Sequence, residues 1–191
     1  MPVRVKGATL INTMAVMREL LPTQRYQALI SGCPVETQHL LRRTLVAVEW
    51  IPADVWSPFL EQVFEQVTQR DEVKFRRILR SICARDFATV NRRLIEGTSA
   101  RGVIAKAPQL YGTYFDAGTF TTRELASHDG VTQAQGELRD FDARSMIYVI
   151  TLHAVLEQLL TLAGAQRLLV TRVRDGRRDG MVTCDYLMTF S

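Results

Sequence analysis

The stretch MVTCDYLMTF, residues 181–190, decides the fold class because it is the clearest β-strand in the chain. Every second side chain in it is apolar: Val182, Cys184, Tyr186, Met188 and Phe190. A period of two predicts a strand with one face toward a core and the other toward solvent. Residues 167–174 precede it across 175–180, and we expect these two segments to form a hairpin.

A second hairpin is predicted upstream. Residues 119–126 and 131–138 flank Asp129-Gly130, a dipeptide that is typical of tight hairpin turns. Between the two hairpins, residues 142–163 are apolar on most sides and are followed by Gly164. This pattern predicts a long central helix that is buried in the core.

The N-terminal half is predicted to be helical. Apolar residues recur at helical spacing within residues 10–21, 59–67 and 75–82. The sequence therefore predicts an α+β fold, in which a helical N-terminal half packs on an antiparallel sheet made of two C-terminal hairpins, with a long central helix. A length of 191 residues suits one domain, so we expect residues 1–191 to form a single ligand-binding or interaction domain.

Several helix boundaries can be predicted from capping residues. We expect Ser57 to cap the helix over 59–67, with Pro58 as its first residue. The apolar phase shifts at Phe87, so we expect Asp86 to cap a separate helix. Another helix is expected to end just before Gly118.

The composition excludes several classes of protein. Hydrophobic residues make up 47% of the chain and charged residues 23%, which is typical of neither a disordered tail nor a membrane protein. No apolar run reaches the roughly 20 residues of a membrane span. The first ten residues lack the apolar stretch of a secretory signal, so a cytoplasmic location is expected. The three cysteines are far apart and predict buried thiols, with no disulfide framework and no metal site.

The positive charge is concentrated in one segment. Residues 70–93 contain 8 basic and 3 acidic residues, within a net charge of +4. Lys74, Arg77, Arg80 and Arg85 lie opposite the apolar face of the predicted helix, so they are candidate partner-binding residues. Aromatic side chains for base stacking do not interleave with them, which makes nucleic acid an unlikely partner. A solvated helix face or an acidic protein partner explains the pattern more simply.

Aromatic residues gather in two segments and suggest an apolar ligand site. The candidate ligand-binding residues are Trp56, Phe59, Tyr111, Tyr114, Phe115 and His153. The alternative is that they form ordinary core. His153 lies one helical turn before Glu157, which could orient its ring as a general base or a haem ligand, whereas the simpler interpretation is a hydrogen-bonded core histidine. No phosphate-binding loop, serine-hydrolase elbow or zinc-protease motif is present.

The order of several short motifs carries a family resemblance. They are Val5-Lys6-Gly7, Trp56-Ser57-Pro58, Ala107-Pro108 followed by Tyr114-Phe115-Asp116-Ala117-Gly118, Leu162-Ala163-Gly164, and Gly180 with Cys184-Asp185-Tyr186. Together they span nearly the whole chain. The chain resembles the superfamily that joins the vinyl-4-reductase-like domains, the haem–NO-binding sensor domains and the TRAPP-subunit fold. In particular, it is similar to an uncharacterised paralogous family described from myxobacteria.

This resemblance implies an α+β domain, often dimeric, whose helices and sheet enclose an apolar cavity. Members that bind haem use a histidine and a Tyr-x-Ser-x-Arg signature, and this signature is absent here. The resemblance therefore implies that no haem cofactor is bound. The vinyl-4-reductase-like members carry a further cysteine near the last hairpin, where this chain has Arg172 to Arg178, so a metal or thiol role is not expected for Cys184.

Three functional hypotheses follow from the sequence. The leading one is a non-enzymatic cytoplasmic sensor or signalling module that binds a small apolar ligand, a protein partner such as a second copy of itself, or both. The second is a reductase-like enzyme acting on a tetrapyrrole-like or other hydrophobic substrate, with His153 and Glu157 handling a proton. The third is a binder of phosphate, nucleic acid or an acidic protein through the basic helix 70–93. No catalytic motif is present, which favours the first hypothesis without excluding an enzyme.

Overall fold

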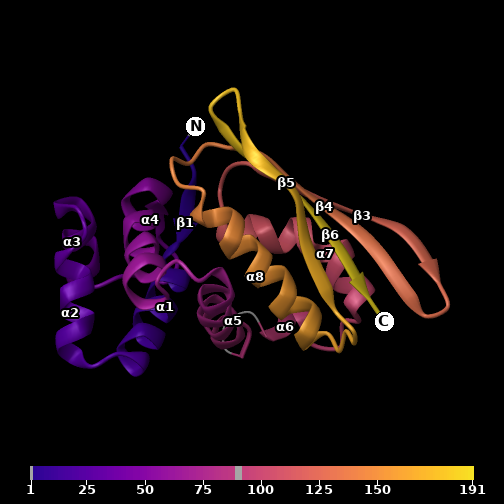
Figure 1. The fold of residues 1–191 in the computed structure, drawn as a ribbon, viewed down its shortest axis with the longest axis horizontal. Coiled ribbons are helices and arrows are strands. Elements are labelled where there is room, and N and C mark those ends of the chain that lie inside the picture. Colours follow the sequence, from indigo (N-terminus) through magenta and orange to yellow (C-terminus); the bar gives the residue numbers. More distant parts are fainter. Residues whose placement is uncertain (1, 89–91) are drawn as a thin grey trace.

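Two hairpins lie side by side in one antiparallel sheet, in a computed structural model that describes residues 2–88 and 92–191 (Figure 1). The first hairpin is β3 (Thr119–His128) with β4 (Val131–Phe141), and the second is β5 (Leu169–Arg178) with β6 (Met181–Phe190). The strand order is β3-β4-β6-β5, so β4 and β6 join the hairpins, with Leu138 opposite Cys184. Side chains along β6 alternate between half-buried and buried, as its period of two predicts.

Both hairpins turn through an Asp-Gly dipeptide. The backbone φ angles are 49° and 76° at Asp129 and Gly130, and 52° and 80° at Asp179 and Gly180. Two successive positive φ angles match the twist of the flanking strands. The predicted loop over 175–180 was too long, because β5 continues to Arg178 after a bulge and leaves only two residues for the turn.

The N-terminal half consists of helices and one short strand pair. The elements in chain order are β1 (Arg4–Lys6), α1 (Gly7–Leu20), α2 (Thr23–Ser31), α3 (Val35–Arg42), β2 (Trp50–Pro52), α4 (Ala53–Gln62), a π-helical turn η1 (Val63–Val67), α5 (Glu72–Ala88), α6 (Arg92–Ile95) and α7 (Ala100–Tyr114). In Figure 1, α1 to α4 lie at the opposite end of the molecule from the sheet. The predicted α+β class is confirmed.

The predicted central helix is α8 (Ile147–Leu162). It packs against α5 on one side and against the sheet on another, and Figure 1 shows it between them. It begins at Ile147 rather than at 142, and the Ser145 hydroxyl accepts a hydrogen bond from the Ile147 amide at 3.2 Å. Gly164, at φ 83°, lies just after its end as expected.

Two predicted helix boundaries were wrong. Strand β2 pairs with β1, with Ile51 opposite Val5, and α4 follows directly at Ala53, so Ser57 is buried inside the helix and Pro58 also lies within it. Helix α5 runs through Asp86 to Ala88, and Asp86 turns toward α1 instead of capping a new helix.

A third predicted end also differs. Helix α7 stops at Tyr114 and the chain extends from Phe115, so Gly118 lies beyond the helix cap. Gly118 has a φ angle of 79° and lies against the Tyr111 side chain. A Cβ on Gly118 would be 2.6 Å from the Tyr111 hydroxyl oxygen.

The buried side chains of both halves form one continuous hydrophobic cluster. It includes Leu10 and Trp56 from the N-terminal helices, Leu156 from α8, and Tyr186 from β6. In the parts of the chain that the structure describes, no helix has the length and apolar character needed to cross a membrane.

The start of α1 depends on a close backbone approach at Gly7. The Gly7 amide donates to the Glu49 carbonyl at 2.9 Å, and a Cβ on Gly7 would lie 2.2 Å from the Val46 carbonyl oxygen. We expect Gly7→Ala to lower the free energy of unfolding by about 2 kcal/mol or more, because backbone must shift to relieve the clash.

Gly112→Ala is the matched control for this prediction. Gly112 lies inside α7 with no atom near its missing Cβ, so alanine should raise stability by about 0.5 to 1 kcal/mol. Urea unfolding of both variants checks the pair. An equal and small effect of the two substitutions would contradict the close packing at Gly7.

Candidate functional site

An apolar cavity lies where the N-terminal helices meet the C-terminal half. Its walls come from β1, α1, α4, α5, α7, β3 and α8, and it encloses about 70 Å³. Four of the predicted ligand-binding residues line it: Trp56, Tyr111, Tyr114 and Phe115. Phe59 is not one of the lining residues. It is completely buried and packs against Trp56, with the ring centres 5.3 Å apart.

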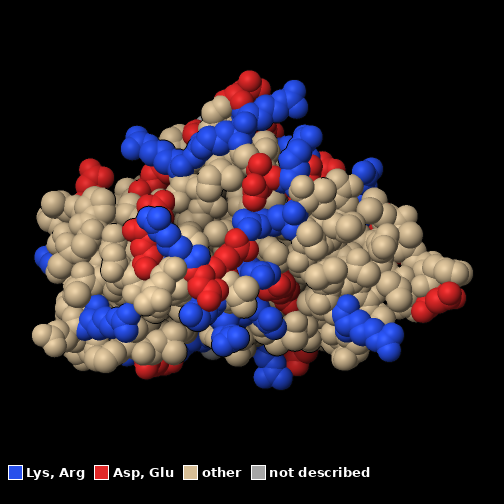
Figure 2. Space-filling view, in the orientation of Figure 1, with Lys and Arg blue, Asp and Glu red and all other residues tan. Residues whose placement is uncertain are grey.

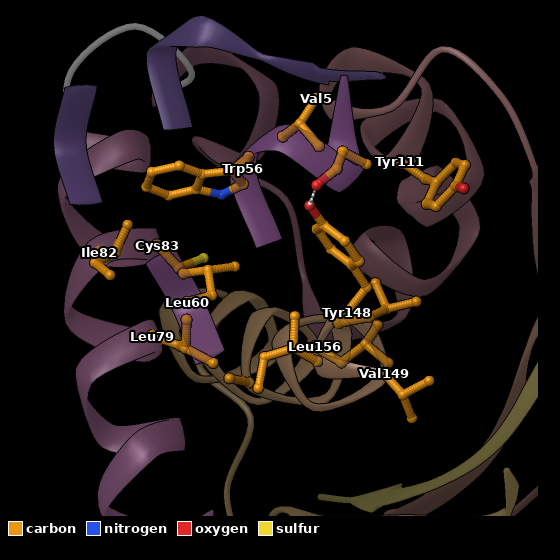
Figure 3. Packing of buried hydrophobic residues seen from close by; sticks show 14 of the residues in the cluster. Val5, Trp56, Leu60, Leu79, Ile82, Cys83, Tyr111, Tyr148, Val149 and Leu156 are labelled. Atoms are coloured by element: carbon orange, nitrogen blue, oxygen red, sulfur yellow. Dashed lines mark hydrogen bonds between the residues drawn. The ribbon is translucent and has the colours of Figure 1, made fainter. Parts of the chain in front are cut away.

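The walls are largely apolar, and the hydroxyl groups of two of their tyrosines bond to backbone carbonyls. Figure 3 shows Trp56, Leu79, Cys83 and Leu156 around the space, with the Tyr148 hydroxyl bonded to backbone. Tyr148 donates to the Ala53 carbonyl at 2.7 Å. Tyr111 likewise donates to the Ala117 carbonyl at 2.8 Å. The cavity therefore offers ring faces and aliphatic carbon to a ligand.

The main polar feature of the cavity lies where α1 and α5 meet. Asp86 on α5 is 5% exposed, lines the cavity and accepts a hydrogen bond from the Asn12 side chain of α1. Burial raises the pKa of Asp86 to about 7, although the bond from Asn12 acts in the opposite direction. The hydroxyl of Thr9, one turn before Asn12, also lines the cavity and is buried without a hydrogen-bond partner among the described residues.

Sequence reasoning missed the role of Asp86, which it treated as a helix cap. A signal was present, however. Asp86 follows Leu79 and Cys83 at the i+7 and i+3 positions, so it lies in phase with the buried face of α5. An acidic residue in phase with a buried stripe indicates either a buried polar contact or a site.

His153 lies apart from this cavity. It is on the side of α8 that faces α5 and β5, where it lines a surface cleft with Arg76 and Arg172. The Arg76 guanidinium donates to His153 Nε2 at 2.7 Å and to Glu157 Oε1 at 2.6 Å. The two residues that we considered as a proton-handling pair are thus joined by a guanidinium.

The same cluster ties α5 to the sheet. Glu72 of α5 forms an ion pair with Arg172 of β5, and Arg76 lies 3.6 Å from the same carboxylate. Burial opposes ionisation of Glu157, but the hydrogen bond with His153 and the charge of Arg76 prevail and lower the pKa of its carboxyl. We name these five side chains, Glu72, Arg76, His153, Glu157 and Arg172, the ion cluster.

The predicted partner-binding residues are not one uniform basic surface. Arg80 bonds to the Gln158 side chain of α8 at 3.2 Å, and Arg85 pairs with Glu19 of α1 at 2.6 Å. Lys74 lies 3.3 Å from Asp71, while Arg77 is exposed. Figure 2 shows basic and acidic side chains side by side on the face that carries α5 and β5. Binding of a partner by these four residues remains a prediction.

The three cysteines are buried and unpaired by disulfides, as expected. Burial raises the pKa of Cys33 and of Cys184 to about 11, so these thiols stay protonated at neutral pH. Within the described ranges, no group of three or more His, Cys, Asp or Glu side chains is arranged to hold a metal ion.

Comparison with known proteins gives a fold but no sequence family. No family model matches the chain, and no curated protein matches it significantly. A point variant of Tt H-NOX superposes with a TM-score of 0.69 at 11% identity, over 97% of this chain and 95% of that one. The chain has the H-NOX fold. A T. tengcongensis H-NOX mutant gives a TM-score of 0.64 at 11% identity, over 97% of each chain.

A third H-NOX structure is described as an oxygen-binding domain related to soluble guanylate cyclases. It gives a TM-score of 0.64 at 11% identity, over 97% of this chain and 95% of that one. These matches support the haem–NO-binding branch of the resemblance at the level of fold. The links to the vinyl-4-reductase-like domains and the TRAPP subunits have no such support.

The side chains that line the cavity do not fit the haem that this fold family implies. Neither a histidine nor an arginine or lysine is among the described lining residues. The Cys83 thiol lies on the wall, but burial raises its pKa and keeps it protonated. The Asp86 carboxyl would repel the carboxylates of a haem. An enclosed volume of about 70 Å³ is also far below the roughly 300 Å³ or more of a drug-sized ligand pocket.

The raised pKa of Asp86 predicts a pH-dependent stability. In the unfolded chain an aspartate ionises near pH 4, whereas Asp86 in the folded chain does so at about 7. Between these values the folded state binds more protons, so this group lowers the free energy of unfolding as the pH rises. We expect the Asp86→Asn variant to gain stability relative to the parent between pH 4.5 and 8, by at most about 4 kcal/mol.

Urea unfolding of both proteins at several pH values measures the difference between their free energies of unfolding. The other titrating groups are the same in both proteins, so their contributions cancel in this difference. The asparagine keeps an oxygen that can accept from Asn12, so the comparison isolates the charge. A difference that stays constant with pH would show that Asp86 does not titrate in this range.

The ion cluster predicts a second stability effect. Glu157→Gln leaves the half-buried Arg76 guanidinium without its closest carboxylate, and we expect a loss of about 1 to 3 kcal/mol at pH 7. The loss should shrink at low pH, because the lowered pKa of Glu157 stabilises the fold only while that carboxyl is ionised. Glu96→Gln, which removes an exposed pair with Arg92, should cost less than about 0.5 kcal/mol. Equal effects of the two variants in chemical unfolding would contradict this assignment.

Proposed function

We propose that the chain is a non-enzymatic sensor domain, acting as one unit over residues 1–191, whose cavity binds a small apolar ligand. The observation that carries the proposal is a largely apolar cavity whose walls come from both halves of the molecule. A well-packed core of this size rarely leaves such a space between its elements. The H-NOX fold supports a sensor role, since matching structures include an oxygen-binding domain related to soluble guanylate cyclases.

The ligand that we propose is not haem. The donor set of the cavity and its volume favour a molecule of a few heavy atoms, held mainly by dispersion and by exclusion of water. Such a molecule would contact α1, α4 and α8 together with α5, so it would stabilise their packed arrangement.

Helix α5 connects the cavity to the surface of the molecule. Helix α5 carries Leu79 and Cys83 on the cavity wall, and Glu72 and Arg76 in the ion cluster nearer to its N-terminus. We propose that ligand binding shifts α5 and alters the ion cluster, which a protein partner or a second copy of the chain would read. A cytoplasmic location and a homodimer are part of this proposal.

The enzymatic alternative has less support. A substrate that used His153 and Glu157 would have to displace Arg76, which bonds to both. We therefore assign these residues to the ion cluster, where they hold α8 against α5.

Xenon binding tests the cavity directly, because xenon enters dry apolar cavities and needs no polar contact. We expect xenon to shift the NMR signals of Leu79, Cys83 and Leu156 in the wild-type protein. Cys83→Leu adds carbon atoms to the wall and should abolish these shifts.

Ser81→Leu is the matched control, since it places the same side chain on the exposed face of the same helix. It should leave the xenon shifts unchanged. Absence of any xenon effect on the cavity-lining residues of the wild-type protein would overturn the proposed function.

A further inference from the structure

The two edge strands of the sheet differ in charge. In the order β3-β4-β6-β5, each outer strand pairs with a single neighbour among the strands that the structure describes. The charged side chains of β3 are one arginine and one glutamate, Arg123 and Glu124. Strand β5 carries four arginines and one aspartate: Arg172, Arg174, Asp175, Arg177 and Arg178. The β5 edge is therefore strongly basic, whereas the β3 edge is balanced.

A surface cleft runs along β5. Six consecutive residues of the strand, from Val170 to Asp175, line this cleft, and its other lining residues are Glu72 and Arg76 of α5 and His153 of α8. The cleft has a volume of about 290 Å³. Figure 1 shows α8 beside β5. A segment bound in the cleft can thus meet the backbone of an edge strand as well as side chains of the ion cluster.

The β5 edge selects among the strands that could pair with it. An edge strand has backbone N–H and C=O groups that another strand can bind, and charged side chains oppose unwanted pairing. Arginines repel strands that are basic and attract strands that are acidic. Leu169 and Val173 are exposed on the same strand and offer apolar contact area. These features favour an acidic strand as the occupant of this edge.

Two of the arginines are available to a partner. Arg174 is 80% exposed, and its ion pair with Asp185 is long, at 3.8 Å. Arg178 is also exposed and lies 3.8 Å from Asp179. Such long contacts between exposed groups contribute little free energy, so carboxylates of a partner can replace them. The two arginines are four residues apart in a strand, which places both side chains on one face.

A buried polar atom gives independent support for a ligand in the cleft. The His153 side chain lines the cleft and is 5% exposed, and its Nδ1 has no hydrogen-bond partner among the described residues. A buried polar atom without a partner costs free energy. A polar side chain that enters the cleft from a bound segment would supply the missing partner.

We propose that β5 binds an extended acidic segment of a protein partner, which joins the sheet as a further strand. Backbone hydrogen bonds to β5 would hold the segment, and its acidic side chains would bind Arg174 and Arg178. The inference rests on the proposed function, because it names the surface at which a partner reads the ion cluster: Arg172 belongs both to that cluster and to β5. The β5 strand of a second copy does not fit this edge, since it is equally basic.

Two peptides of equal length test the charge of the partner. One is an eight-residue peptide that alternates threonine with glutamate, and the other alternates threonine with lysine. By fluorescence anisotropy we expect the glutamate peptide to bind the wild-type protein about ten-fold or more tightly than the lysine peptide. Equal binding of the two peptides would overturn the proposal.

Substitutions on the two edge strands test the location. Arg174→Glu should weaken binding of the glutamate peptide by about ten-fold, and Arg178→Gln should weaken it several-fold. Arg123→Glu is the matched control, because Arg123 is an exposed arginine on β3, where it bonds to Gln135. This control should leave the binding unchanged. An equal loss in Arg174→Glu and Arg123→Glu would indicate attraction to the whole basic protein and contradict a site on β5.

Amide hydrogen exchange tests whether the peptide joins the sheet. The glutamate peptide should slow the exchange of amides within residues 170–175 and leave those of β3 unchanged, because an added strand accepts hydrogen bonds from the edge that it covers. Binding without this protection would rule out strand addition. An oligothymidylate of eight nucleotides should bind more weakly than the glutamate peptide, and equally tight binding would assign the surface to nucleic acid instead.

The outcomes separate this inference from the proposed function. If xenon enters the cavity but the glutamate peptide does not bind, the β5 surface is wrong and the sensor proposal stands. If the peptide binds β5 but xenon does not enter, the cavity function is wrong and the docking surface stands.

Discussion

The placement of α5 between three neighbours is the constraint on which the rest of the structure depends. The Asn12 to Asp86 hydrogen bond holds α5 against α1, and Arg76 holds it against α8 through His153. The Glu72 to Arg172 pair adds a contact with the sheet. Because these contacts are polar and directional, they fix how closely the helices approach, and the apolar side chains then leave a space between them.

Much of the fold could be predicted because its signals are local. Alternation along β6 and the Asp-Gly turns depend on neighbouring residues, so the hairpins follow from sequence alone. The start of α4 depends instead on Ile51 pairing with Val5, which is distant in the chain. The local capping preference predicted that the helix starts at Ser57, but it starts at Ala53, directly after the strand that pairs with β1.

The candidate site was predictable to a similar degree. Clustering of aromatic residues in two segments predicted Trp56 and Tyr111 as neighbours of a common space, and both line the cavity. The position of His153 could not be predicted in this way. Helix α8 is apolar on most sides, so its sequence does not show which face meets α5 and which meets the cavity. The face of α8 that carries His153 meets Arg76 of α5.

The same fold can support different ligand chemistry when the wall residues differ. At 11% identity the chain shares the arrangement of helices and sheet with the H-NOX structures, and its cavity is lined by aromatic and aliphatic side chains with the Asp86 carboxyl among them. A fold fixes where a cavity forms, because helix packing determines the space, whereas side chains decide its charge and width. The overall likeness therefore does not carry a ligand from one protein to another, because the ligand depends on the side chains that line the cavity.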